Sequence, residues 1–186
     1  MEKKKLRKQI AELKKEHGHI QLRNMSEPLV NSLLKNERIC SADTILLYWS
    51  LPDEVYTHNM VRQLALDGHT VLLPKVQEDN ELTLHRYTSD YDLLCGAYGI
   101  MEPATPALTE TECATLLDDC SVGIIPGVAF SKDGHRLGRG KGYYDRLLSR
   151  LPGIYKIGLC FDFQIIEDIP HNAHDICMDM VWCRES

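Results

Sequence analysis

A glycine-rich segment at residues 134–145 restricts the possible structures and functions of this chain more than any other part of its sequence. It reads G-H-R-L-G-R-G-K-G-Y-Y-D, so that glycines alternate with cationic side chains. Glycine accepts a positive φ angle and lets backbone N–H groups approach an anion closely. Arg136, Arg139 and Lys141 add positive charge and side-chain donors. The segment therefore predicts a loop that holds phosphate.

The sequence on either side indicates that this loop connects a strand to a helix. The apolar run at 122–130 is typical of a buried strand, and residues 143–151 have helical spacing. A helix N-terminus would then face the same anion. The spacing is neither that of a P-loop nor that of the dinucleotide fingerprint G-x-G-x-x-G. The alternative is a solvated surface connection, but its three cations would repel one another unless an anion offset them.

Composition favours a single-domain enzyme or binding protein. With 186 residues, 44% of them apolar, the chain can bury one core, and it has no linker or repeat. The formal net charge of −6 argues against nucleic-acid and membrane partners, so a phosphate site must be a local basic cluster. Seven cysteines without C-x-x-C spacing indicate free thiols. Because no membrane span or signal peptide is recognisable, we expect a cytoplasmic protein.

Strands and helices alternate along the sequence. Two helices come first, one with an apolar stripe at Leu6, Ile10 and Leu13 and a second opened by Ser26 with Pro28 in its first turn. Strands are expected at 44–49, 70–76, 82–87, 122–130, 155–161 and 180–183, with helices after Thr57 and near 110–117 and 143–151, and a looser region around 99–103. This order predicts one three-layer α/β/α domain over residues 1–186, with a mostly parallel sheet covered on both faces.

Polar residues follow several of these strands. Ligands of an open parallel sheet bind beyond the carboxyl ends of its strands, so we expect these segments to share one site. They are residues 50–57, 74–75, the glycine-rich segment, 162–164 and the tail at 171–175.

Two aspartates are the best candidates for a divalent cation beside phosphate. Magnesium takes few protein carboxylates and keeps waters and phosphate oxygens as its other ligands. Asp145 directly follows the glycine loop and Asp175 lies in the tail. The alternatives are an ion pair of Asp145 with Arg146 or Arg139, and a turn cap for Asp175. The H-x-x-H of the tail has no third ligand at a zinc-site spacing, which disfavours zinc.

Other residues suit an aromatic ligand. Glu54 could bind an amide or amino-pyrimidine edge, or it could complement the dipole of the following helix. Trp49, Tyr98 and Tyr143 offer flat surfaces for a ring, although each residue alone is more often part of a core than of a pocket.

Several short sequence motifs, spread over essentially the whole chain, together resemble those of the 5-formyltetrahydrofolate cyclo-ligase family, whose members are also called methenyltetrahydrofolate synthetases. The glycine-loop motif is highly specific for that family, whereas Lys-x-x-x-Arg alone is not. The motifs are Lys3-x-x-x-Arg7, Tyr48-x-Ser50 with Glu54-Val-x-Thr57, Leu73-Pro-Lys75, Gly99-Ile-x-Glu102-Pro, the run from Pro126 through Asp145, and Gln164 followed by His174-Asp175.

The resemblance implies an ATP- and Mg²⁺-dependent ligase that converts 5-formyltetrahydrofolate to 5,10-methenyltetrahydrofolate and releases ADP and phosphate. The formyl oxygen would be phosphorylated before N10 attacks. The implied architecture is that of NagB, RpiA and the CoA transferases. The implied partner is a small-molecule folate, with or without a polyglutamate tail, and the chain would act as a monomer without nucleic acid or membrane.

The resemblance also implies roles for individual residues. A helix at about 2–17 would pack over the nucleotide site. The catalytic group would be Arg139, Lys141 and Tyr143, and Asp145 and Asp175 would bind magnesium. The nucleotide would be held by Lys3, Arg7, Gly134, Arg136, Leu137, Gly138, Arg139, Gly140, Lys141, Gly142, Tyr143 and Tyr144. The folate would be held by Trp49, Glu54, Tyr98, Arg139, Gly140, Lys141, Gly142 and Tyr143.

Two other functions remain open at this point. A sugar-phosphate isomerase could use a similar layout, with Glu54 or Glu102 as general base and no nucleotide hydrolysis. A binding protein could keep the pocket without turnover. Release of ADP that depends on a formyl-folate would exclude the isomerase, and the near-ultraviolet absorption of the methenyl product would separate all three functions.

Overall fold

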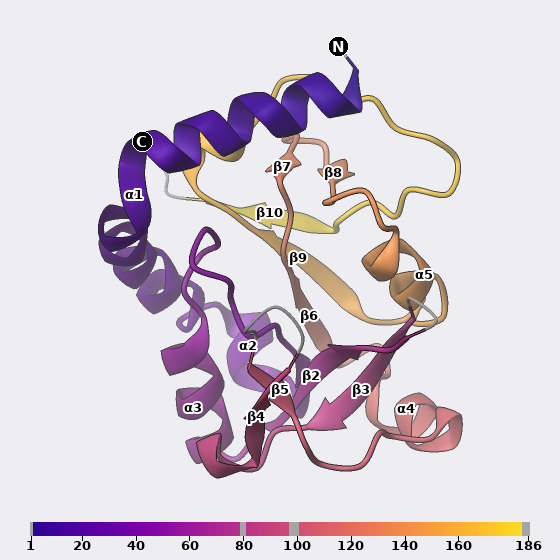
Figure 1. The fold of residues 1–186 in the computed structure, drawn as a ribbon. Helices are drawn as coiled ribbons and strands as arrows, with labels where there is room; N and C mark the ends of the chain where they lie inside the picture. The colour runs from indigo at the N-terminus through magenta and orange to yellow at the C-terminus, as the bar shows by residue number, and fades with distance from the viewer. Residues whose placement is uncertain (1, 79–80, 97–100, 184–186) are drawn as a thin grey trace.

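A six-stranded sheet forms the centre of the computed structural model, which describes residues 2–78, 81–96 and 101–183 (Figure 1). The strand order is β10-β9-β6-β1-β2-β3. Neighbours pair in parallel except β3, which is antiparallel to β2. The mostly parallel α/β fold predicted from the sequence is thus confirmed. The strands are β1 (Thr44–Leu46), β2 (Thr70–Val76), β3 (Leu82–Arg86), β6 (Val122–Ile125), β9 (Tyr155–Leu159) and β10 (Met180–Trp182).

Helices cover both faces of the sheet (Figure 1). Successive side chains of a strand point to opposite faces. Ile45 of β1 accordingly lies in the cluster with α1, α2 and α3, and Leu46 in the cluster with α5 and the end of α4. Burial on both faces is the reason that the strands read as continuous apolar runs. The helices are α1 (Lys3–Leu33), α2 (Glu37–Ser41), α3 (His58–Leu66), α4 (Glu110–Leu116) and α5 (Tyr143–Ser149).

The long helix α1 is broken at Gly18, whose φ of 69° and ψ of 159° are not helical. Its first half packs Leu6 and Ile10 in a small separate cluster with Ala129 and Leu137. These two residues belong to the hairpin of β7 (Ala129–Phe130) and β8 (Arg136–Leu137), over which the first half of α1 runs in Figure 1. The second half of α1 packs into the main core.

The predicted start of a second helix at Ser26 was wrong. The helix continues through this residue, and the hydroxyl of Ser26 donates to the carbonyl of Leu22 at 2.7 Å. The same oxygen accepts from the N–H of Tyr56 at 2.9 Å, which occupies the group that would have capped a helix. Gly18, which tolerates a positive φ, makes the break instead.

The apolar run at 122–130 is not one strand, contrary to expectation. β6 ends at Ile125 because Pro126 has no N–H to donate to the sheet, and the chain resumes pairing only in β7. The looser region contains β5 (Met101–Pro103), which forms a small antiparallel pair with β4 (Leu93–Cys95) just before that region. Short 3₁₀ turns, η1 (Asp90–Asp92) and η3 (Asp162–Gln164), complete the described elements. Over the described ranges, no helix has both the length and the apolarity needed to cross a bilayer.

Candidate active site

A cavity of about 330 Å³ lies beyond the carboxyl ends of β1 and β6, between the first half of α1, the glycine loop and the tail before β10. This is the volume and position expected for a small-molecule site in an open α/β sheet. Its walls bring together residues far apart in the sequence. Those expected from the sequence are Lys3, Arg7, Glu54, Arg136, Leu137, Gly138, Arg139, Gly140, Lys141, Gly142, Tyr143, Tyr144, Asp145 and Asp175; Pro126 and Gly127 complete the lining.

The glycine loop connects β8 to α5 and takes backbone conformations that side chains disfavour. Gly140 has a φ of 102° and Gly142 a φ of 69°. The carbonyl of Gly138 accepts a hydrogen bond from Nε of Arg7 at 2.8 Å, which fixes the loop to α1. The loop and the first half of α1 therefore form one cationic wall.

Cations outnumber carboxylates five to three among the lining residues, although the whole chain is acidic. Arg136 is buried, and its Nε has no hydrogen-bond partner in the described part of the molecule. Lys141 is exposed, and its ammonium contacts no hydrogen-bonding or charged group among the described residues. A surplus of positive charge with unused donors suits an anion such as phosphate.

Asp145 and Asp175 lie close together on the cavity wall. Oδ1 of Asp145 accepts from Nη2 of Arg136 at 3.0 Å and from the N–H of Ile176 at 3.3 Å. Oδ2 of Asp175 accepts from Nζ of Lys3 at 2.5 Å and from the N–H of Asn172 at 2.7 Å. Burial opposes ionisation of Asp175, but the hydrogen bonds from Lys3 and Asn172, together with the charges of Lys3 and Arg136, lower its pKa overall.

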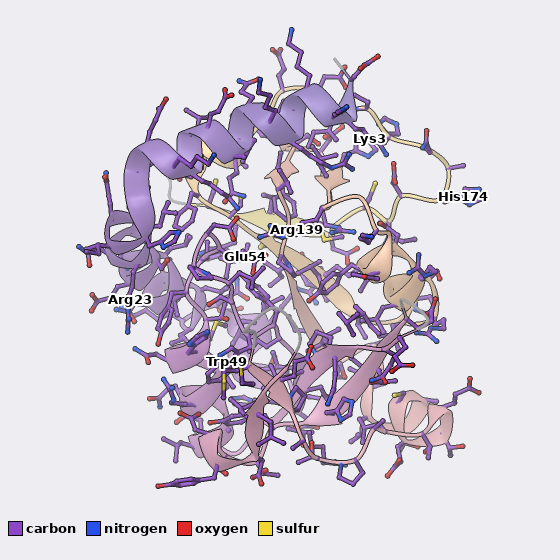
Figure 2. The ribbon with its side chains drawn as sticks, viewed as in Figure 1. Lys3, Arg23, Trp49, Glu54, Arg139 and His174 are labelled. Atoms are coloured by element: carbon purple, nitrogen blue, oxygen red, sulfur yellow. The ribbon has the colours of Figure 1, made fainter. Side chains whose placement is uncertain are left out.

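These two carboxylates fit a magnesium ion that keeps waters and phosphate oxygens as its remaining ligands. No group of three or more His, Cys, Asp or Glu residues able to hold a metal occurs in the described ranges. The two tail histidines do not converge on one point. The ring of His171 stacks on His135 with centroids 3.6 Å apart, and His174 lies at the outer end of the tail loop in Figure 2.

Arg139 and Glu54 point toward one another near the middle of the view in Figure 2. Nη2 of Arg139 lies 3.0 Å from Oε1 of Glu54 and 2.8 and 3.0 Å from the two oxygens of Asp53. Asp53 also accepts from Nζ of Lys14 at 3.1 Å. Burial alone would raise the pKa of Asp53, but Lys14 and Arg139 lower it overall.

The lowered pKa of Asp53 gives an expected pH dependence of stability. A depressed folded-state pKa stabilises the protein above the unfolded value of about 4, and the contribution is lost as the pH falls through the folded-state pKa. An Asp53→Asn variant should therefore be less stable than the wild type at pH 7, with a difference that shrinks toward pH 3. Urea unfolding across this range measures the difference. A difference that stays constant would contradict the ionised pair.

Two of the residues expected at the site, Gly134 and Trp49, do not line the cavity, and a third cannot be placed. Tyr98 lies outside the described residues. Gly134 does not line the cavity; its carbonyl accepts from the N–H of Met178 at 2.8 Å and so holds the tail. Trp49 stacks on His58 with centroids 3.9 Å apart.

His58 helps to line a second cavity of about 210 Å³, and this cavity shares Glu54 with the first. Burial lowers the pKa of His58 to about 4, so its ring is neutral at pH 7. Trp49 therefore packs against an uncharged wall of this second cavity.

Sequence reasoning gave no role to Asp53 or Lys14. A signal for Asp53 existed in its place beside Glu54 at the end of a strand. Lys14 follows Ile10 by four residues, which puts it on the apolar side of a helix, and a lysine there needs a partner.

The sequence as a whole matches one family. A family model described as the 5-formyltetrahydrofolate cyclo-ligase family matches residues 1–184. The chain belongs to this family. The prediction of an enzyme is thereby confirmed.

Individual relatives of the cyclo-ligase family agree with this match. The 5-formyltetrahydrofolate cyclo-ligase of Mus musculus is 29% identical over 167 residues, which cover 85% of this chain and 81% of the relative. That of Saccharomyces cerevisiae is 34% identical over 156 residues, 71% of each chain.

Solved structures extend the likeness to the fold. The 5,10-methenyltetrahydrofolate synthetase of Aquifex aeolicus superposes with a TM-score of 0.81 at 34% identity, covering 98% of this chain and 90% of that one. The synthetase of Mycoplasma pneumoniae gives a TM-score of 0.75 at 26% identity and covers 98% of each chain. The likeness to NagB, RpiA and the CoA transferases stays a prediction, as do the single-domain boundaries and the roles of individual residues.

Proposed function

We propose that this cyclo-ligase converts 5-formyltetrahydrofolate to 5,10-methenyltetrahydrofolate in an ATP- and Mg²⁺-dependent reaction that releases ADP and phosphate. The observation that carries the proposal is that one cavity is lined by the glycine loop, five cations and two neighbouring aspartates. Family membership supports the folate as substrate. The arrangement of charge supports the nucleotide.

The chemistry needs an activated formyl group. A formamide carbon is a poor electrophile because its oxygen leaves badly. Bound ATP would supply a phosphoryl group to that oxygen, with magnesium offsetting part of the phosphate charge. N10 of the folate then attacks the formyl carbon, and phosphate departs with the former formyl oxygen as the ring closes.

The protein would act by positioning and electrostatics. Lys3, Arg7 and Arg136 would hold the nucleotide phosphates, while Arg139 and Lys141 would stabilise the charge on the transferred group. No side-chain nucleophile takes part in this scheme. Tyr143, which lines the same cavity, would lie between nucleotide and folate.

Asp145 and Asp175 would bind the magnesium ion. Their present partners are cations, Arg136 and Lys3, which could turn to the phosphates once the metal arrives. Two carboxylates leave most of the magnesium coordination to water and phosphate oxygens, as this ion prefers.

Glu54 would bind the amino-pyrimidine edge of the folate. Its side chain is 12% exposed and lies between the two cavities. The second cavity, bordered by Leu51 and His58, would extend the folate site away from the phosphates. Trp49 supports this wall from behind through its stacking on His58.

A direct assay tests the proposal. Protein, ATP, magnesium and 5-formyltetrahydrofolate should together produce the near-ultraviolet absorption of the methenyl product, with one ADP released for each product. Chelating magnesium with EDTA should abolish turnover, and excess magnesium should restore it. ADP release without folate conversion, or folate binding without turnover, would refute the proposed reaction.

A further inference from the structure

Lys14 is a buried cation that none of the proposed chemistry uses. Its side chain is only 7% exposed, on the first half of α1. A buried ammonium is costly unless it is paired, and Nζ of Lys14 lies 3.1 Å from Oδ2 of Asp53. The pair therefore joins the helix to the segment that carries Glu54.

The same Asp53 carboxylate fixes one end of Arg139. Both of its oxygens accept from Nη2 of Arg139, and Glu54 accepts from this same nitrogen. Within the described residues, Nη1 and Nε of Arg139 have no hydrogen-bond partner, and Arg139 lines the phosphate cavity. One end of the guanidinium is thus bound to protein while its other donors are available to a ligand.

Charge balance gives Lys14 its importance. Lys14 and Arg139 oppose Asp53 and Glu54, so the four groups together are neutral. Without Lys14, two carboxylates would share one guanidinium, and the excess negative charge would compete with a phosphate for Arg139. With Lys14 present, the charge of Asp53 is already offset.

We propose that Lys14 is a positioning residue, which acts through Asp53 to hold Arg139 with Nη1 and Nε free for a phosphate group. The inference rests on the proposed function, because that function gives Arg139 its anionic ligand. Lys14 itself does not line the phosphate cavity. Its effect is carried by the two contacts of Asp53.

The test replaces Lys14 with methionine, which keeps the length of the side chain and removes its charge. We expect the dissociation constant of Mg-ATP, measured by calorimetry without folate, to rise about tenfold or more, and kcat to fall about 10- to 100-fold, by analogy with partners that orient metal ligands. Lys14→Arg should retain most of both. Lys15→Met is the matched control, because Lys15 is exposed on the same helix and outside the phosphate cavity.

A second readout separates positioning from a purely structural role. The carboxyl carbon of Asp53, followed by NMR, should titrate at higher pH in Lys14→Met, because one of the two cations that lower its pKa is gone. If Lys14→Met folds poorly, combining it with Asp53→Asn removes the carboxylate charge that Lys14 no longer offsets. Because the double variant also lacks the carboxylate that fixes Arg139, positioning predicts that it still binds Mg-ATP weakly.

The outcomes are distinct. Wild-type affinity for Mg-ATP in a folded Lys14→Met protein, or in the double variant, would overturn the inference. If the wild type makes no methenyl product but Lys14→Met still weakens Mg-ATP binding, the proposed reaction fails while the positioning role stands.

Discussion

Replacing Lys141 with alanine should remove most of the turnover and leave the protein folded. Lys141 lines the cavity and is exposed, and its ammonium makes no contact with the described residues that folding would lose. By analogy with a lost oxyanion donor, kcat should fall about 10²- to 10³-fold, or about 3 kcal/mol of transition-state stabilisation. Steady-state formation of the methenyl product measures the loss.

Lys132→Ala is the matched control for this variant. Lys132 is exposed on the turn between β7 and β8 and does not line the phosphate cavity. Its removal changes net charge equally, so it should leave turnover and urea stability unchanged. Near-native turnover of Lys141→Ala would count strongly against a phosphate role for the glycine loop.

Replacing Gly134 with alanine should cause the largest loss of stability. Gly134 has a φ of 95°, and an added Cβ would lie 2.3 Å from the carbonyl oxygen of Met178. The positive φ costs about 1–2 kcal/mol and the overlap about 1–3 kcal/mol more. The overlapping oxygen belongs to the backbone of Met178, whose N–H donates a hydrogen bond to the carbonyl of Gly134. A side-chain rotation therefore cannot relieve the overlap. Urea unfolding of the variant measures the total.

Gly68→Ala separates the two contributions. Gly68 has a φ of 96° but open space around the position of a Cβ, so this variant carries the conformational cost without the overlap. It should therefore lose less stability than Gly134→Ala. Equal losses in the two variants would mean that the tail is able to move away from Gly134.

Local signals in the sequence predicted much of the fold and most of the lining of the cavity. Apolar runs marked the strands because each strand is buried on both faces. The alternation of glycines and cations identified the loop because the residues that form it lie next to one another in the sequence. The tail around Asp175 could be expected at the site from its polar residues, and the resemblance also covered it.

The features that were missed depend on contacts between distant residues. Nothing near Ser26 shows that its hydroxyl is occupied by Tyr56, so the helix start was misplaced. The sharing of Asp53 by Lys14 and Arg139 joins three separate segments, and no local pattern encodes such a meeting. Trp49 was expected at the cavity from its ring and from the resemblance, but it stacks on His58 and does not line the phosphate cavity.

The break at Gly18 divides α1 between two hydrophobic clusters of unequal size. The first half buries little more than Leu6 and Ile10, and it is otherwise fastened by charged contacts such as that of Lys3 with Asp175. It can therefore detach as a local unfolding unit at lower free energy than the rest of the domain. Ligand binding in the neighbouring cavity and ordering of the amino-terminal segment are then thermodynamically linked. A bound ligand favours the ordered segment, and an ordered segment raises the affinity for the ligand.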